Sequence, residues 1–304
     1  MIPAAADDFL AAWLATPFLC WGIGPYLALN ISFWMSVALI EGVNFFCTKS
    51  TLIEYSSSRK REERLKSETP LRNQLLGSFM TTMGPVAISN VILLAKIGPW
   101  LIPGPYPTPS SVSLFTLVNE SAKFLGLIIL NDSLHYFTHR MAHECEFLYK
   151  HLHSHHHEIH TPRASGAAFI TMADATLQEG LPIIASVAMI QPHPLTFYAF
   201  VVVRMAETVS VHSGISCDSW LAVLFWKSRM FLAFGLAGNE HHDQHHKCSD
   251  RSLNAKNFAE RFIYLDYLFG TLSKAPHKQL ARHYRERMLH VHLMKHRVEI
   301  HDRR

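Results

Sequence analysis

Long stretches without any charged side chain constrain this 304-residue chain more than any other feature. Residues 9–40 and residues 73–95 contain no Asp, Glu, Lys or Arg. About 20 consecutive apolar residues are enough for a helix to span a bilayer. Charged residues make up only 17% of the chain, whereas soluble proteins have about a quarter. The sequence therefore predicts a membrane protein.

These stretches predict an all-α, multi-span protein with about four transmembrane helices. Residues 9–40 supply one span, or a tight hairpin broken near Gly22–Pro25. Residues 73–95 supply another span, which we expect to end at Lys96 and the proline-rich stretch 99–109, because proline lacks the helix donor. A β-barrel would instead need short alternating strands.

Three further apolar segments are interrupted. Residues 113–134 carry Glu120, Lys123 and Asp132, so this helix is expected to face protein rather than lipid. Residues 180–203 predict one span, or two half-spans around Pro192 and Pro194. Residues 219–236 contain two basic residues and predict a segment at the membrane interface.

Two segments are basic. Residues 49–72 hold seven Lys/Arg against four Asp/Glu, and residues 274–304 hold nine against three. Basic segments beside spans favour the cytosolic side, and they lack the interleaved aromatic residues of a nucleic-acid site. The expected division is an N-terminal region of spans and basic loop (1–110), a catalytic domain (111–273) and a basic tail (274–304). Five cysteines without a CxxC pair predict free thiols.

Histidine is the second unusual feature, because thirteen of the 21 histidines fall in the two windows 135–160 and 241–246. Many of them are three or four residues apart, a spacing that brings side chains to one face of a helix. The spaced sets are His139 and His143; His153, His156 and His157; and His242, His245 and His246.

These eight histidines predict a metal centre in a helical cap. Neutral imidazole is the commonest side-chain metal ligand, and eight of them exceed the four ligands of one zinc ion. Two metal ions would use them, although imidazole suits iron, copper and zinc alike. His135 and His160 remain possible extra ligands, whereas His151 and His155 lie off the shared face. The tail histidines are expected at a solvated surface.

The ordered motifs resemble the fatty acid hydroxylase/sterol desaturase superfamily. The resemblance runs from about Asp132 to Thr271 and rests on motifs read directly from the sequence. They are Asp132-x-x-His135-Tyr136-Phe137-x-His139-Arg140-x-x-His143, Glu207-Thr208-x-x-Val211-His212-Ser213-Gly214, His241-His242-Asp243-Gln244-His245-His246 and Asp266-Tyr267-Leu268-Phe269-Gly270-Thr271.

The resemblance implies a membrane di-iron enzyme with His212 as a ninth ligand. It implies two iron ions, O2 as oxidant, and electrons from NAD(P)H through cytochrome b5 and its reductase, acting in trans. It also implies a multi-pass location in the endoplasmic reticulum membrane, with the histidine boxes facing the cytosol. The sequence departs from several relatives at Thr171–Asp174, where these carry His-Pro-x-Glu, which indicates a divergent substrate.

The resulting hypothesis is an O2-dependent monooxygenase that hydroxylates, or oxidises a methyl group of, a sterol-like, terpenoid or other lipid. Asp132 and Asp243 are candidates to accept hydrogen bonds from ligand ring N–H groups. A lipid desaturase of the same superfamily and a catalytically inactive relative remain alternatives. A metal transporter is a weaker one, because the long apolar stretches lack the ionisable residues that transport needs.

Overall fold

The computed structural model describes residues 4–46, 69–108, 113–159, 162–215, 220–232, 234–248 and 255–273. Most of the basic loop, the basic tail, His160, Cys47 and Cys217 lie outside the described residues. The described part is helical and has no β-strand, only an isolated antiparallel bridge between Leu236 and Phe262. The prediction of an all-α fold is confirmed.

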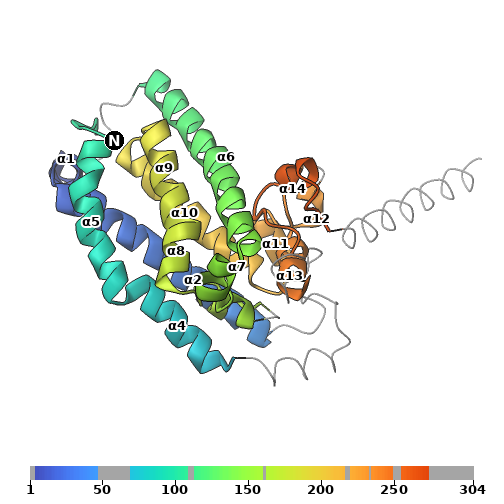
Figure 1. Ribbon diagram of the computed structural model, residues 1–304. Coiled ribbons are helices and arrows are strands. Elements are labelled where there is room, and N and C mark those ends of the chain that lie inside the picture. Colours follow the sequence, from blue (N-terminus) through green and yellow to red (C-terminus); the bar gives the residue numbers. More distant parts are fainter. Residues whose placement is uncertain are drawn as a thin grey trace, which may run out of the picture.

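The first two spans lie side by side in the N-terminal third. Helix α1 (Ala4–Ala15) leads into a π-helical turn η1 (Phe18–Ile23) and then helix α2 (Gly24–Phe46). Helices α4 (Leu71–Met83) and α5 (Pro85–Leu101) follow, with a break at Gly84. Figure 1 shows them as a blue and a cyan layer on one side of the molecule.

The expected end of the second span was wrong. Helix α5 runs through Lys96 and Pro99 and ends at Leu101. Pro99 falls in the last turn, where its missing N–H removes a single helical hydrogen bond. Lys96 is exposed at the helix surface, so neither residue prevents the helix from continuing.

Helix α6 (Leu114–Glu144) corrects a second expectation, because most of its apolar surface faces outward. Only 11% of its most hydropathic window is buried, and Leu117, Leu125 and Ile129 are among its exposed side chains. Two of the charged residues that suggested a protein-facing helix, Glu120 and Asp132, do have partners on other elements. Glu120 accepts hydrogen bonds from the His193 N–H and the Thr196 hydroxyl.

Helices α9 (Leu181–Ile190) and α10 (Pro194–Val211) are two pieces separated by Gln191–His193. Gln191 adopts a left-handed conformation with φ 50°. Four stretches are long and apolar enough to span a membrane, and α9 is not among them: 18–43, 71–101, 114–144 and 194–211. The predicted number of about four spans is confirmed.

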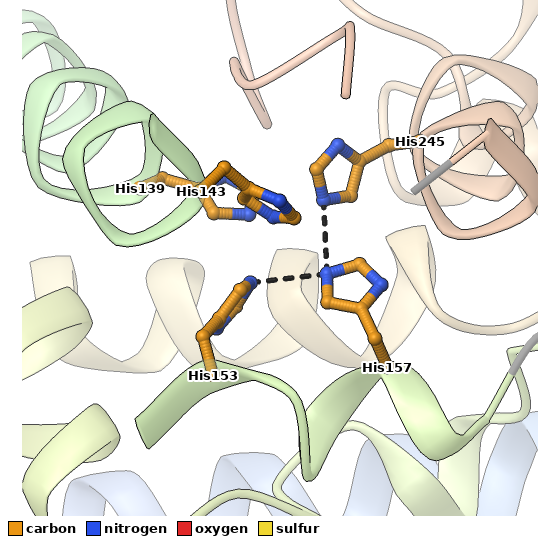
Figure 2. A group of neighbouring side chains, drawn as sticks. All are labelled: His139, His143, His153, His157 and His245. Atoms are coloured by element: carbon orange, nitrogen blue, oxygen red, sulfur yellow. Dashed lines mark hydrogen bonds between the residues drawn. The ribbon is translucent and has the colours of Figure 1, made fainter. Parts of the chain in front are cut away.

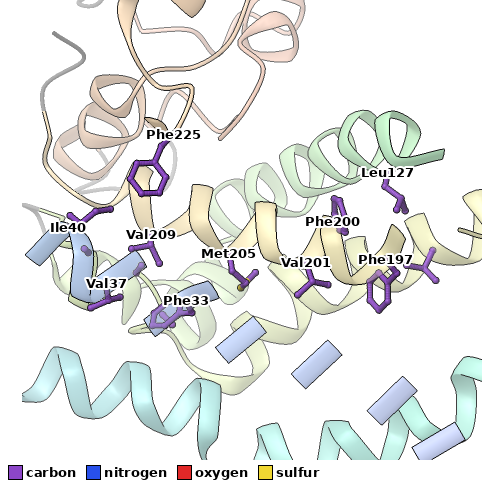
Figure 3. Close-up of a cluster of buried hydrophobic side chains, with 14 of the residues drawn as sticks. Phe33, Val37, Ile40, Leu127, Phe197, Phe200, Val201, Met205, Val209 and Phe225 are labelled. Carbon is purple, nitrogen blue, oxygen red and sulfur yellow. The ribbon is translucent and has the colours of Figure 1, made fainter. Parts of the chain in front are cut away.

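Helix α10 forms the centre of the bundle and packs against α2 and α6. Figure 3 shows Phe33 and Val37 of α2 against Val201 and Met205 of α10, with Leu127 of α6 on the other side. In a bilayer, close van der Waals packing of this kind holds helices together, since lipid tails are as apolar as the side chains. This packing fixes the C-terminal end of α10, where His212 follows.

The short elements form a cap around the C-terminal ends of α6 and α10 (Figure 1). We use "cap" for the described residues of 145–180 and 212–273. Its elements are α7 (Glu146–Leu148), η4 (Tyr149–His153), η5 (His156–Glu158), η6 (Ala164–Gly166), α8 (Met172–Ala175), η7 (Thr176–Gly180), α11 (Trp220–Leu224), α12 (Arg229–Leu232), α13 (Asn239–Cys248) and α14 (Tyr264–Leu268).

A buried ionic network fastens the cap to the spans. The Arg261 guanidinium binds both carboxylate oxygens of Glu207 on α10. The Arg204 guanidinium, also on α10, binds Glu179 at 2.6 Å and contacts Glu260. Buried charges are stable only when they are paired and hydrogen-bonded, so these contacts fix residues 255–273 against α10.

Candidate metal centre

Nine buried histidines converge inside the cap, and they form two adjacent groups. In each group, the ring nitrogens that could bind a metal lie within 4.8 Å of one another. The five-histidine group, drawn in Figure 2, contains His139, His143, His153, His157 and His245. The four-histidine group contains His156, His212, His242 and His246. These nine positions are the ones that the sequence and the resemblance gave as candidate ligands.

The helical spacing predicted the first box correctly and the second one wrongly. His139 and His143 lie one turn apart on α6, and both enter the five-histidine group. Residues 149–158 are not one α-helix but a π-helical turn followed by a 3-10 turn. His153 and His157 enter the five-histidine group and His156 enters the four-histidine group, so this segment supplies both groups.

Helix α13 supplies ligands to both groups. His245 enters the five-histidine group, and His242 and His246 enter the four-histidine group. His212 directly follows the last residue of α10 and completes the four-histidine group. The two groups thus share α13 and the 149–158 segment, so a change in either element affects both.

Hydrogen bonds fix the orientation of six of the nine rings through their Nδ1 atoms. Five of these bonds go to backbone carbonyl oxygens and one to a carboxylate, none of which can donate. The pairs are His139 with Phe258 O, His153 with Asp174 Oδ2, His156 with Phe169 O, His212 with Thr208 O, His245 with Lys256 O and His246 with Ile159 O. In each neutral ring the proton must therefore lie on Nδ1, which leaves a lone pair on Nε2.

The Nε2 atoms stand at the spacing of ligands around one ion. Neighbouring Nε2 atoms are 3.0 Å apart for His153 and His157, and 3.1 Å apart for His156 and His212. Two imidazole nitrogens bound at about 2.1 Å to one ion, at right angles to each other, would be about 3.0 Å apart. The observed separations fit such an arrangement.

Without a cation, this arrangement would be repulsive in the four-histidine group. His156 and His212 both use their Nδ1 protons on backbone carbonyls. Their Nε2 lone pairs consequently face each other across 3.1 Å. Protonation does not relieve the contact easily, because desolvation lowers the pKa of His212 and holds that of His156 well below 6.5. A bound metal ion would satisfy both lone pairs.

His143 leads to the same conclusion in the five-histidine group. Both of its ring nitrogens are buried and make no hydrogen bond. A buried polar nitrogen without a partner costs about 1–3 kcal/mol. A metal ion bound by the surrounding rings would remove that cost. The donor set is entirely imidazole, which suits iron, copper or zinc.

Two carboxylates that the sequence argument did not assign hold histidines in place. Asp174 accepts from His153 Nδ1 at 2.8 Å, and Asp266 accepts from His241 Nε2 at 3.0 Å. Asp266 also accepts the backbone N–H groups of Phe258 and Ala259. It therefore shapes the loop whose carbonyls bind His139 and His245. Asp266 stood in a quoted sequence motif and Asp174 in the segment that departs from the relatives, which was the available signal.

The expectation for Asp132 was wrong. Its two oxygens accept the backbone N–H groups of Arg261 and Phe262 instead of an imidazole N–H. The reason is its place on α6, two turns before His139, where the 255–273 segment crosses the helix. Asp243 is buried on α13, and its proposed contact with a ligand ring stays a prediction.

Thr171, which stands where several relatives have histidine, has a structural role here. Its hydroxyl accepts the Asp174 N–H at the start of α8 and donates to Leu152 O. The departure from the relatives' pattern therefore occurs at a residue that positions Asp174, which in turn holds His153. This segment contributes to the site through a carboxylate.

The other histidines in the described part of the chain lie outside both groups. His135, which the sequence left open as a ligand, forms a separate cluster with Glu179 and Glu260. Its Nδ1 donates to Gln178 O, and its Nε2 lies 3.7 Å from Glu260 Oε1. His155 pairs with Glu158 near the surface, and His151 is exposed.

A largely apolar cavity of about 290 Å³ lies between the spans and reaches the cap. Phe197, Val201, Met205 and Thr208 of α10 line it. Eleven residues of helix separate the first and last of these, so the cavity follows α10 for about 16 Å. At its cap end, Thr208 lines the cavity while its carbonyl holds His212.

The fold and the site together define a class: a helical membrane protein whose cap carries a histidine-rich site able to hold metal. The family model described as fatty acid hydroxylase matches residues 124–271, a range that contains all nine histidines. Residues 124–271 thus match a fatty acid hydroxylase domain, which agrees with the resemblance found in the sequence.

Curated relatives belong to the same superfamily. A very-long-chain aldehyde decarbonylase of Oryza sativa subsp. indica is 35% identical over 172 residues, 56% of this chain and 59% of the relative. A methylsterol monooxygenase of Arabidopsis thaliana is 34% identical over 164 residues, 53% of this chain and 56% of the relative. Another is 25% identical over 231 residues, 76% of this chain and 72% of the relative.

The chain spans only part of the length of the first relatives it matches, for example 59% of one and 52% of another. No solved structure matches the chain significantly.

Proposed function

We propose that this protein is a membrane-bound, iron-dependent monooxygenase that uses O2 to hydroxylate, or oxidise a methyl group of, a lipid. A sterol-like or terpenoid lipid is the favoured substrate class. The observation that carries the proposal is the convergence of nine buried imidazoles, several with Nε2 lone pairs that face one another at ligand spacing. The family and the methylsterol monooxygenase relatives favour iron and oxidation.

Each histidine group would hold one iron ion. Iron bound there would supply the activation of O2 that an unreactive C–H bond requires. The chain's own contribution is to keep the imidazoles neutral, to orient them through Nδ1 and to exclude water from the site. Burial achieves the first task, since desolvation and neighbouring histidines hold the pKa of His157 and His246 well below 6.5.

The cavity along α10 is the proposed lipid site. Its apolar walls would bind the hydrocarbon part of the substrate, and its cap end lies against residues that hold two ligands. Thr208 carries His212 on its carbonyl, and Ala168, which lines the cavity, precedes Phe169, whose carbonyl carries His156. A lipid in this cavity would therefore present its end to the four-histidine group.

The partners and the location belong to the same proposal. Electrons would come from NAD(P)H through cytochrome b5 and its reductase, acting as separate proteins. The enzyme would lie in the endoplasmic reticulum membrane with its cap and histidines on the cytosolic side, where basic segments of membrane proteins gather. Asp243 would orient a ligand ring from α13.

A second reaction is suggested by the aldehyde decarbonylases, which are among the relatives with the higher identities. The same centre would then act on a lipid aldehyde and release a hydrocarbon one carbon shorter, with the carbonyl carbon leaving as carbon monoxide. Desaturation is a third outcome of the same chemistry, in which C–H bonds on two adjacent carbons are cleaved and no oxygen enters the product.

Product analysis separates these reactions. The chain would be expressed in a sterol-producing host under ¹⁸O-labelled O2, with His245→Ala as the inactive variant and the exposed His151→Ala as its matched control. Label in an alcohol product supports the proposal, a new double bond without label indicates desaturation, and a shortened hydrocarbon indicates decarbonylation. Lipid profiles that are identical for the wild type and His245→Ala would refute an enzymatic role.

A further inference from the structure

Two neighbouring residues of the cap, Trp226 and Lys227, show the reverse of the burial expected for a protein in water. Trp226 is 48% exposed, whereas the neighbouring Lys227 is 1% exposed. Lys227 Nζ donates to Glu260 O at 3.1 Å and lies 3.8 Å from Glu207 Oε1. Lysine is almost never fully buried in soluble proteins, and tryptophan is usually covered. Here the charge points inward and the indole points outward.

The backbone at this turn is strained. Trp226 has φ 56°, in the left-handed region that large side chains rarely adopt. Hydrogen bonds from Trp226 N to Val223 O and from Lys227 N to Ala222 O hold the turn. The turn thus holds an exposed indole directly beside a buried ammonium group.

Trp226 belongs to a larger set of exposed apolar residues, which we call the cap patch. Phe234 is 77% exposed, Tyr267 74% and Leu268 68%. Two parts of the chain supply it, and backbone hydrogen bonds between residues 235–237 and residues 261–263 join the segments that follow Phe234 and precede α14. Its members are Val223, Leu224, Trp226, Met230, Phe234, Tyr267, Leu268 and Phe269.

The cap patch continues the outward apolar face of α6. The ring of Phe269 lies 5.5 Å from that of Phe137 on α6, which is itself exposed. The Tyr264 hydroxyl at the start of α14 is 2.9 Å from the Ser133 hydroxyl of the same span. In Figure 1, α12 and α14 lie nearer the beginning of α6 than α13, which carries histidines.

The length of α6 gives the level of this contact in the bilayer. A hydrocarbon core of about 30 Å takes about 20 helical residues. Counted from Leu114, the first residue of α6, those residues end at Ser133. The cap patch therefore begins where α6 would leave the hydrocarbon core, a level at which tryptophan and tyrosine are enriched in membrane proteins.

We propose that the cap patch is a lipid-facing surface that lies in the bilayer interface beside α6. Its aromatic composition, its continuity with the exposed face of a candidate span and the inward position of Lys227 all match a lipid environment. These apolar side chains, exposed on the protein, would then insert partly into the lipid and anchor the cap. The histidine centre would thereby be held against the membrane. This inference concerns the surface of the cap and does not depend on the reaction.

Spin-label accessibility tests the proposal in the intact chain. The five native cysteines would be replaced by alanine, and a nitroxide attached to Phe234→Cys or Leu268→Cys in phosphatidylcholine nanodiscs. Ile129→Cys on the exposed face of α6 is the lipid reference, and Lys150→Cys on an exposed charged position of the cap is the water reference. Only variants that retain the metal content of the cysteine-free parent protein would be compared. If Phe234→Cys or Leu268→Cys loses metal, Tyr267→Cys takes its place.

The proposal predicts that both cap labels collide often with O2 and rarely with a water-soluble nickel chelate, as Ile129→Cys does. Frequent collision with the chelate, as for Lys150→Cys, would mean that the patch faces water. Protection from both reagents would mean that protein covers it, either a segment of this chain or a second copy. Each of these two results would overturn the proposal.

Native Trp226 provides a check that needs no label. Brominated lipid should quench part of the tryptophan fluorescence of the wild type. Trp226→Phe should lower that quenched part without abolishing it, because Trp100 on α5 is 86% exposed and should be quenched as well. An unchanged quenched fraction in Trp226→Phe would contradict the proposal.

Discussion

The two histidine groups are built from similar rings but are held by different parts of the chain. In the five-histidine group, His139 and His245 bind carbonyls of the C-terminal loop at Phe258 and Lys256. In the four-histidine group, His212 binds the carbonyl of Thr208 inside α10. In that group, Phe169 O and Ile159 O of the cap also hold His156 and His246. The first group therefore depends on the C-terminal loop, whereas the second combines one contact inside a span with two contacts to residues 159–169.

The difference also concerns access. Thr208 and Ala168 both line the cavity. The carbonyl of Thr208 holds His212, and the carbonyl of Phe169, the residue after Ala168, holds His156. Both of these histidines belong to the four-histidine group. An ion with six ligand positions would retain two open positions there and one in the five-histidine group. Since catalytic metal sites keep an open position, we expect the substrate to meet the four-histidine group.

Removal of one ligand from each group should have the largest effect. His143→Ala and His212→Ala are each expected to abolish lipid oxidation, because both ions are needed. Each variant should lose mainly the ion of its own group, so that iron content falls from about two to about one per chain. Elemental analysis of the purified variants measures this, with His151→Ala as the control. Loss of both ions in both variants would contradict independent groups.

Filling the cavity should impair substrate binding without touching the metal. Val201 lines the cavity, whereas the adjacent Val202 points outward and is 43% exposed. Val201→Phe is expected to weaken lipid binding by roughly 5–100-fold, since overpacking costs about 1–3 kcal/mol. Val202→Phe should change little. Measured KM for the lipid and iron content distinguish the cases, and equal effects of the two variants would exclude this cavity as the lipid site.

A change at Asp266 should affect one group selectively. Asp266 accepts two backbone N–H groups of the loop that carries the carbonyl partners of His139 and His245. Loss of such supporting contacts typically lowers metal affinity by about 10–100-fold. Asp266→Asn should therefore weaken the five-histidine group and spare the other. Iron titration of the metal-free variant would reveal this as one weakened site; two equally weakened sites would mean general unfolding of the cap.

Acid should destabilise the metal-free protein, and this effect should be the most gradual of those predicted here. Burial lowers the pKa of His245 to about 3, whereas histidine in an unfolded chain titrates near 6.5. Between these two values the unfolded chain binds more protons than the folded one. The free energy of unfolding therefore falls with pH, by up to about 1.4 kcal/mol per pH unit for each such histidine.

Thermal unfolding of the metal-free protein between pH 8 and pH 5 measures this dependence. The melting temperature should be constant above about pH 7.5 and fall below about pH 6.5. His245→Asn should show a shallower decline than the wild type, because it lacks one of these groups. A melting temperature that rises toward pH 5 would show that the folded histidines gain protons.

Local sequence patterns were enough to predict the spans and the set of candidate ligands. Uncharged stretches locate α2 and α5, and spacing locates the histidines of α6 and α13. The division of the histidines into two groups could not be predicted from spacing. The regular helix α13 supplies ligands to both groups, and residues 149–158, which fold into π- and 3-10-helical turns, do so as well.

Contacts between distant segments were also out of reach. Asp174 and Asp266 accept hydrogen bonds from His153 and His241, which are 21 and 25 residues away in the chain. No local spacing could therefore assign these partners. The outward orientation of α6 was missed for a similar reason. Glu120 and Asp132 are satisfied by α10 and by the 255–273 segment, and these partners become visible only when the helices are assembled.

The central claim is that each histidine group holds one metal ion. Crystals of the iron-loaded, full-length protein, measured at the iron absorption edge, test it directly. Two anomalous peaks per chain are predicted, one surrounded by His139, His143, His153, His157 and His245, and the other by His156, His212, His242 and His246. A single peak, or iron bound instead at His135, Glu179 and Glu260, would contradict the account.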